Sequence, residues 1–244
     1  KNAIAGLALL FAAFCVHANA SDAAQLRFGV DPTYAPFESR APSGQLVGFD
    51  IDLGNEICAR LKAKCVWVEN DFDGMIPALK AKKFDGVLSS MSMTPQRAEQ
   101  IAFSSKLFNT PTRLVAKKGS GILPTADSLK GKSVGVEQGT IQETYAKTYW
   151  ESKGVKVVPY QNQDQVYADL LSGRLDAALQ DAVQADIGFL KTPRGAGFDF
   201  VGKDLDVSAK DRAELKSWHS YTGDEDPPDD RKPDHGTSKA QFGW

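Results

Sequence analysis

Two stretches of the sequence follow one pattern, in which a helical segment leads through a polar turn into a short apolar strand with a polar end. The first runs from Leu79 to Ser90 and the second from Leu170 to Asp181, and they align without a gap. A second short pattern links Phe28-Gly-Val-Asp31 with Val134-Gly-Val-Glu137. Helix–turn–strand units often look alike, so chance similarity is the alternative. A true repeat predicts two similar lobes.

Short apolar strands alternate with helical segments along most of the chain. Strands are expected at residues 26–30, 65–68, from 84, 113–116, 133–136, 155–158 and 175–179, and helices at 50–61, 75–82, from 95, 140–150, 164–171 and 181–190. Asp50 is expected to cap the first of these helices. This alternation predicts an α/β protein with mainly parallel sheets.

Polar residues end several of these strands. Ligands of open α/β sheets bind outside the carboxyl ends of the strands. If the two lobes face each other, Asp31 and Ser90 of one lobe will lie across a cleft from Glu137 and Asp181 of the other. The sequence therefore predicts a polar cleft between the lobes.

One strand end is rich in hydrogen-bond donors. It leads into a helix start at Thr94-Pro95, since Thr is a favoured N-cap and Pro a favoured first helical residue. Arg97 lies in the first turn, where a cation opposes the helix dipole. A carboxylate from outside would fit there, held by the guanidinium, N–H groups and hydroxyls. A surface arginine on an ordinary turn is the alternative. The hydroxyls are those of Ser89, Ser90 and Ser92.

Length and charge set broad limits on the function. The chain has 244 residues, enough for one or two domains. Its net charge of −2 gives no electrostatic footprint for nucleic acid. No apolar run is long enough to cross a membrane as a mature segment.

The N-terminus has the pattern of a secretory signal peptide. Lys1 precedes an apolar run at 4–14, and Ala18-Asn-Ala20 matches a cleavage site, so we expect an exported chain after residue 20. A lipoprotein at Cys15 is a poorer fit, because bulky Phe14 precedes it.

Two cysteines, Cys58 and Cys65, remain in the mature chain. In an exported protein they favour a disulfide that closes a small loop over a pair of buried thiols. A metal site is disfavoured, because the histidines are His17, His219 and His235, far along the chain from the other candidate ligands.

A basic amino acid would match the charged and aromatic residues together. Arg97 suits a carboxylate, Asp181 suits an ammonium and Asp31 adds a second acid. Tyr34 and Phe72 lie in loops, where their rings could flank a guanidinium or an aliphatic stem. Taken singly, each acid could be a turn or helix cap and each ring a hydrophobic plug. Only the joint pattern predicts a binding site.

Several ordered motifs between Leu26 and Val201 resemble the periplasmic amino-acid-binding proteins of ABC importers, most closely the lysine/arginine/ornithine- and histidine-binding group. The motifs are Asp31-Pro-Thr-Tyr-Ala-Pro-Phe37, Gly48-Phe-Asp-Ile-Asp-Leu53, Leu88-Ser-Ser-Met-Ser92 with Arg97, Leu129-Lys-Gly-Lys-Ser-Val-Gly-Val136 and Leu175-Asp-Ala-Ala-Leu-Gln-Asp181. The resemblance implies a two-lobed type II binding protein whose lobes close about a hinge on one amino acid. It also implies a disulfide between Cys58 and Cys65.

The resemblance also implies a role for each residue of the pocket. Carried over position by position, these are Arg97, Ser92, Thr140 and Ile141 for the α-carboxylate, Asp181 with Ser89 or Ser90 for the α-ammonium, Asp31 for the distal cation, Tyr34 and Phe72 beside the side chain, and Gln142 in the cleft wall.

Three positions bear on ligand preference. Phe72 resembles the lysine/arginine/ornithine members, whereas histidine-preferring relatives tend to carry an aliphatic residue. Ile141 stands where relatives often have Thr, so only its N–H can serve. Glu137 stands where they tend to have an apolar residue, and its carboxylate either favours a guanidinium or faces solvent.

The resemblance divides the chain into a signal peptide at 1–20, a first lobe at 21–110, a second lobe at 111–206 and an anomalous tail at 207–244. In this family the chain returns to the first lobe after the second. Here the run 224–234 is charged and proline-rich and cannot form a core. We hypothesise a frameshift or truncation, since otherwise the first lobe would lack part of its core.

The function that these features imply is capture of a basic amino acid in the periplasm by a monomer, without a cofactor, for the membrane permease of an ABC importer. An enzyme on the same scaffold, such as a cyclohexadienyl-type dehydratase, is one alternative. Against it, the matched region has no histidine and no Gly-x-Ser-x-Gly turn. The sensor domain of a receptor is the other alternative.

Overall fold

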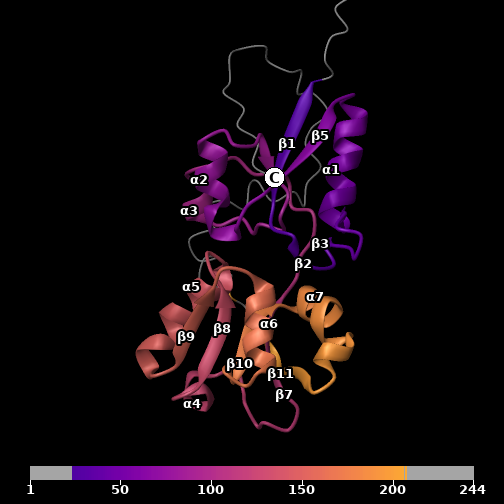
Figure 1. The fold of residues 1–244 in the computed structure, drawn as a ribbon. Helices are drawn as coiled ribbons and strands as arrows, with labels where there is room; N and C mark the ends of the chain where they lie inside the picture. The colour runs from indigo at the N-terminus through magenta and orange to yellow at the C-terminus, as the bar shows by residue number, and fades with distance from the viewer. Residues whose placement is uncertain (1–23, 206, 208–244) are drawn as a thin grey trace, which may run out of the picture.

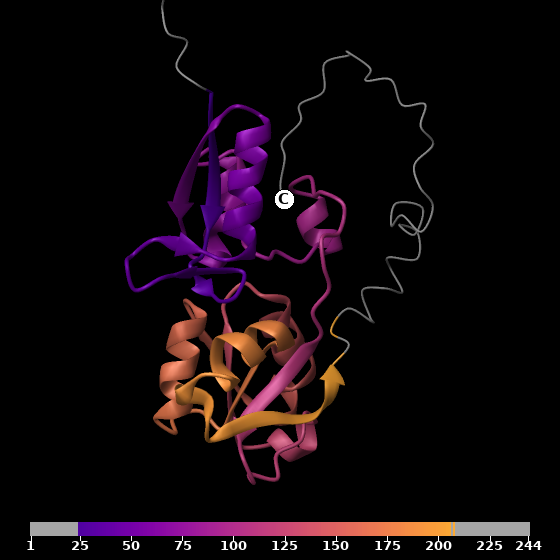
Figure 2. The same cartoon turned by 90° about the vertical axis from the view of Figure 1, so that its right-hand side faces the viewer.

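The computed structural model of the chain describes residues 24–205 and 207, which form two lobes. The signal peptide expected at 1–20 and nearly all of the tail expected at 207–244 lie outside these residues. The first lobe extends from β1 to α3 and the second from β7 to β11, one below the other in Figure 1. Within the described ranges the chain passes between the lobes once, along the segment between α3 and β7 that Figure 2 shows at the side of the molecule.

The first lobe is built on a parallel three-stranded sheet in the order β5-β1-β6. α1 packs on one face of this sheet through Cys58, and α2 packs on the other through Met75 and Leu79. A small antiparallel sheet, β2-β3-β4, lies at the end that faces the second lobe. The elements are β1 (Gln25–Val30), β2 (Thr33–Tyr34), β3 (Glu38–Arg40), β4 (Leu46–Val47), α1 (Phe49–Arg60), β5 (Lys64–Glu69), η1 (Phe72–Gly74), α2 (Met75–Lys80), β6 (Gly86–Val87) and α3 (Pro95–Ala98).

The second lobe is built on a five-stranded sheet in the order β11-β7-β10-β8-β9. β9, β8 and β10 are parallel, whereas β7 runs antiparallel to both β10 and β11. Apolar clusters lie on both faces. The elements are β7 (Thr112–Lys117), α4 (Ala126–Leu129), β8 (Ser133–Glu137), α5 (Ile141–Tyr149), η2 (Glu151–Lys153), β9 (Lys156–Tyr160), α6 (Gln163–Leu171), β10 (Ala177–Asp181), α7 (Ala182–Ala185), the π-helix η3 (Asp186–Leu190), η4 (Pro193–Gly195) and β11 (Phe198–Leu205).

The two lobes repeat one design, as the sequence patterns predict. The order β5-β1-β6 in the first lobe matches β9-β8-β10 in the second. The middle strand of each set of three, β1 or β8, carries a glycine that packs against an apolar side chain. A Cβ on Gly29 would lie 2.5 Å from Phe84, and one on Gly135 would lie 2.4 Å from Leu175. Phe84 and Leu175 align in the two sequence stretches, so the glycines make room for equivalent side chains.

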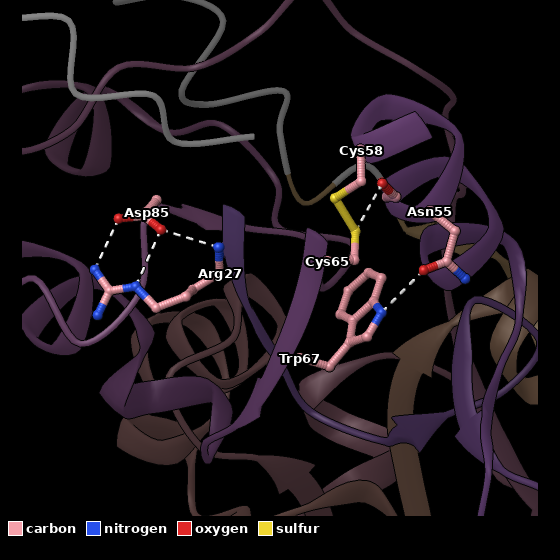
Figure 3. Close-up of a disulfide and its surroundings, with 7 residues drawn as sticks. Arg27, Asn55, Cys58, Cys65, Trp67 and Asp85 are labelled. Carbon is pink, nitrogen blue, oxygen red and sulfur yellow. Dashed lines mark hydrogen bonds and ion pairs between the residues drawn. A yellow bond between two sulfur atoms is a disulfide. The ribbon is translucent and has the colours of Figure 1, made fainter. Parts of the chain in front are cut away.

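A second detail repeats near the start of β1 and of β8. The Asp85 carboxylate accepts a hydrogen bond from the backbone N–H of Arg27 at 2.9 Å, and the Asp176 carboxylate accepts one from the N–H of Ser133 at 2.8 Å. Figure 3 shows the Arg27–Asp85 pair, in which the guanidinium also binds the carboxylate. The aligned aspartates directly precede β6 and β10 and tie these strands to β1 and β8. The sequence similarity therefore reflects a structural repeat.

The repeat is incomplete at one edge. β6 pairs only with β1 within residues 24–205, whereas its counterpart β10 pairs with both β8 and β7. In this part of the chain the first sheet is therefore two strands narrower than the second.

The disulfide between Cys58 and Cys65 is confirmed, and it joins the end of α1 to the start of β5 (Figure 3). Two expectations are wrong. Asp50 does not cap α1: the N-cap is Gly48, and Asp50 lies buried in the first turn. Tyr34, expected in a loop, belongs to β2, which pairs with β3.

No helix among the residues that the structure describes is long and apolar enough to cross a membrane.

Candidate functional site

A pocket between the lobes brings together every residue that the resemblance implies for ligand binding. Glu137, whose role the sequence left open, also lines this pocket. The lining residues are Asp31, Tyr34, Phe72, Ser89, Ser90, Ser92 and Arg97 from the first lobe, and Glu137, Thr140, Ile141, Gln142 and Asp181 from the second.

The strand ends explain why these residues meet. Asp31 directly follows β1 and Ser89 lies just beyond β6, while Glu137 ends β8 and Asp181 ends β10. Parallel strands of one sheet present their carboxyl ends at the same edge. The two sheets turn these edges toward each other, so polar groups from both lobes line one pocket.

Arg97 is turned into the pocket and is not an ordinary surface arginine. Its guanidinium donates to the carbonyl oxygen of Ser92 at 2.6 Å and, across the cleft, to that of Gly139 at 2.8 Å. It also lies over the Phe72 ring, 5.5 Å from the centroid. Burial lowers the pKa of Arg97 to about 10. Among the described residues no carboxylate pairs with it, so its charge is available to an anion.

The N-terminus of α5 lies beside this guanidinium and adds backbone donors. Thr140 is the N-cap, and its hydroxyl accepts from the N–H of Glu143 at 3.2 Å. The N–H groups of Thr140, Ile141 and Gln142 precede Thr144, the first residue whose N–H donates to a carbonyl oxygen of the helix, and they have no backbone partner within it. A helix N-terminus favours negative charge, so Arg97 and α5 together suit a carboxylate.

Asp181 is the acidic counterpart on the second lobe. Its carboxylate accepts from the Tyr34 hydroxyl across the cleft and from Gln142 Nε2 at 2.9 Å. Burial raises the pKa of Asp181 to about 6. Asp181 begins α7 but makes no side-chain cap, so the alternative of a simple helix cap does not hold.

Asp31 combines a turn contact with a free oxygen. Its Oδ1 accepts from the hydroxyl of Thr33 at 2.8 Å and from its N–H at 3.2 Å, which is the turn role considered as the alternative. Its Oδ2 is buried and has no N–H or hydroxyl donor in the described part of the chain. Burial raises the pKa of Asp31. One carboxylate oxygen is thus left to face the pocket.

Two buried carboxyl groups hold the serines of the first lobe. Ser89 Oγ donates to Glu38 Oε1 at 3.0 Å, and Asp50 Oδ2 accepts from the N–H of Ser90 at 2.7 Å. Ser90 has a positive φ of 51°, which a non-glycine residue rarely adopts. Burial and the neighbouring charge of Asp50 raise the pKa of Glu38 well above its ordinary range. This carboxyl pair fixes the serine turn from behind.

Direct contacts join the two lobes around the pocket. Gln138 Nε2 donates to Asp73 Oδ2 at 2.8 Å, and Gln161 donates to Asp71. Gly139 packs against Asp73 so closely that a Cβ would lie 2.7 Å from the Asp73 Cα. The lobes are therefore in a closed arrangement.

Sequence reasoning left the role of Glu137 open and missed the binding role of two further residues. Glu137 was noted as a departure and is buried in the pocket wall, so the solvent-facing alternative is wrong. Glu38 was not singled out and Asp50 was assigned to a helix cap. In the sequence, each of these two residues is recognisable only as an acid near the expected cleft. That observation does not predict a contact with the serines.

A two-lobed α/β architecture with charged groups at facing strand ends defines a class of extracytoplasmic solute-binding proteins. Comparison with known proteins assigns the family. Residues 26–186 match the model of the bacterial extracellular solute-binding proteins, family 3, and the chain belongs to this family.

Two relatives from Escherichia coli K12 and one solved structure illustrate the similarity. The chain is 59% identical over 180 residues to the lysine/arginine/ornithine-binding periplasmic protein, covering 74% of this chain and 69% of the relative. It is 54% identical over 177 residues to the histidine-binding periplasmic protein, covering 72% and 68%. An ancestral arginine-binding protein bound to arginine superposes with a TM-score of 0.70 at 34% identity, covering 82% of this chain and 96% of that structure.

Because Gly139 packs closely against the opposite lobe, we predict that the substitution Gly139→Ala shifts the protein toward a more open arrangement of the lobes. Gly139→Ala places its Cβ against Asp73 and also strains a backbone with φ +79°. We expect a larger radius of gyration by small-angle X-ray scattering and a loss of about 1 kcal/mol in stability from the backbone strain.

Gly173→Ala is the matched control for this variant. Its φ is +76°, but nothing lies within 4 Å of the new Cβ. It should lose similar stability in thermal denaturation while keeping the wild-type radius of gyration. Equal radii for both variants would contradict the closed contact at Gly139.

Proposed function

We propose that the chain is an extracytoplasmic solute-binding protein that captures a basic L-amino acid, namely arginine, lysine, ornithine or histidine, for an ABC importer. The observation that carries this proposal is the set of uncompensated charges in the pocket: one guanidinium, Arg97, and the facing carboxyl groups of Asp31 and Asp181. Relatives named for binding lysine, arginine, ornithine and histidine support it.

The α-carboxylate of the ligand is assigned to Arg97 and the N-terminus of α5. A guanidinium beside free N–H groups matches a carboxylate in both charge and geometry. The Ser92 side chain lines the same wall, and Thr140 and Ile141 supply N–H groups. The Thr140 hydroxyl is engaged in capping, so its contribution comes from the backbone.

The α-ammonium is assigned to Asp181, with Ser89 or Ser90 beside it. An ammonium carries three donors and no acceptor, so it needs several oxygens. The Asp181 carboxylate now accepts from Tyr34 and Gln142, and an ammonium would take up the remaining capacity of its oxygens. Gln142 stays as the donor that orients the carboxylate.

The side chain of the ligand is assigned to the space between the rings of Tyr34 and Phe72, with its distal cation at Asp31. Both rings line the pocket, and flat or aliphatic groups pack well against aromatic faces. Asp31 Oδ2 is buried without an N–H or hydroxyl donor in the described residues, so a distal cation would satisfy it.

Binding proceeds as a clamp. The two lobes, about 24–110 and 111–205, open and close about the segment that joins them, where Phe108 stacks on Phe37 with centroids 4.6 Å apart. Closure removes water from the pocket, so each buried charge must find a partner, and this requirement gives specificity. The permease of the importer would recognise the closed form.

Relatives in the family are named as periplasmic binding proteins and not as enzymes. We propose the same for this chain: export to the periplasm through the signal peptide at 1–20, action as a monomer, and binding without turnover.

A thermal-shift screen of the twenty amino acids and ornithine tests the function. Basic amino acids should raise the melting temperature, because a ligand that binds only the folded state stabilises it. The added amino acid should be recovered unchanged by chromatography. A screen in which acidic or apolar amino acids alone stabilise the protein would refute the proposal.

Removing the guanidinium of Arg97 should abolish most binding. Arg97→Ala leaves the ligand carboxylate buried and unpaired, and we expect affinity for arginine to fall about a hundredfold or more by calorimetry. Arg60→Ala, on the exposed end of α1, is the control and should bind normally. Wild-type affinity in Arg97→Ala would overturn the carboxylate assignment.

Affinity should fall in acid because Asp181 must be ionised to bind an ammonium. Its pKa in the ligand-free protein is about 6, so the ionised form predominates above pH 6 and is lost as the pH falls. At pH 5 only about a tenth of Asp181 is ionised, and affinity should be about tenfold or more weaker than at pH 8. Calorimetry between pH 5 and pH 8 measures the affinity, and melting curves at each pH exclude unfolding. An affinity that stays constant over this range would contradict the prediction.

A further inference from the structure

Glu137 is a buried carboxyl group that the proposed function does not use. It ends β8, is 3% exposed and lines the pocket. No N–H or hydroxyl of the described residues donates to its side chain. Such a group is costly to bury ionised unless a cation meets it.

The group that meets Glu137 is Asp31, from the opposite lobe. Both carboxyl groups are buried and line the same pocket, and the charge of Asp31 acts on Glu137. Asp31 is 4% exposed, and its Oδ2 has no N–H or hydroxyl donor within residues 24–205. The carboxyls thus form a pair, one from each lobe, at the end of the pocket.

The charges that act on Glu137 are negative. Asp181 and Asp164 act on Glu137 from the second lobe, and the Tyr34 hydroxyl feels the Glu137 charge from the first. Burial, followed by the charge of Asp31, raises the pKa of Glu137 well above its ordinary range. No ion pair within the described residues neutralises either carboxyl group, so both are available to a cation that enters the pocket.

The structure assigns Glu137 and Asp31, one carboxylate from each lobe, as a joint acceptor for the distal cation of the ligand, and assigns to Glu137 a preference for a guanidinium. This inference rests on the proposed function. A guanidinium presents five N–H donors in one plane and can bind two carboxylates at once, whereas an ammonium is a compact charge with three donors. The second carboxylate therefore favours arginine over ligands whose distal group is neutral.

Citrulline tests this assignment, because it matches arginine in shape but carries a neutral urea group in place of the guanidinium. Binding of arginine and citrulline is measured by calorimetry at pH 8, with histidine, largely neutral at that pH, as a second neutral reference. In Glu137→Gln the arginine affinity should fall about tenfold to a hundredfold, because a hydrogen bond to a charged group is lost. Citrulline and histidine should change less than about threefold.

Two further variants make the result decisive. Glu137→Leu removes the carboxyl without adding a polar group, and it should lower the ratio of arginine to neutral-ligand affinity as Glu137→Gln does. Asp164→Asn removes an exposed acid that acts on Glu137 but does not line the pocket, and it should leave the ratio unchanged.

The failure of this inference is distinct from failure of the proposed function. If wild type binds arginine but both Glu137 variants keep the wild-type ratio within about threefold, Glu137 is not an acceptor. If wild type binds no basic amino acid, the proposed function itself is wrong.

Discussion

The closed pocket holds charges that the described protein does not pair with one another. Arg97 has backbone acceptors but no carboxylate, and Asp31 and Asp181 have neutral donors but no cation. Burying such charges without partners is unfavourable by several kcal/mol per ion. The arrangement is understandable only if the partner comes from outside and carries both signs. The placement of the charged residues, the closure of the two lobes and the specificity for the ligand all follow from the need to pair these buried charges.

To pair the charges of the ligand efficiently, the polar groups of the pocket must be held in place before the ligand binds. In the first lobe this is done by the carboxyl pair of Glu38 and Asp50, which binds the hydroxyls and an N–H of Ser89 and Ser90. Ser90 keeps an unusual backbone conformation that only such over-determined surroundings maintain. A turn fixed in this way loses little freedom on binding, so more of the interaction energy is available as affinity.

Much of the fold and of the candidate site could be predicted from the sequence. Apolar strands followed by Asp31, Ser89 and Asp181 located the pocket, because parallel strands end at one edge. The short β2 and β4 have no pattern of their own and were missed. The role of Asp50 was missed because a local rule, the N-cap preference, explains an acid at a helix start, whereas its actual partner, Ser90, lies forty residues away. Glu137 is buried by residues of the opposite lobe, and no local sequence pattern predicts a contact between lobes.

The structural repeat explains why the pocket is polar and also why like charges meet in it. Two copies of one sheet, set edge to edge, bring equivalent positions together across the cleft. Where the copies differ in charge the pocket becomes polar: Ser90 aligns with Asp181, and the ammonium is assigned to that end. Where the copies carry the same charge, as at Asp31 and Glu137, closure buries like groups in one pocket. Like charges buried near each other oppose closure unless one is protonated or a cation joins them. The same symmetry that builds the cleft therefore makes its closure depend on what the cleft contains.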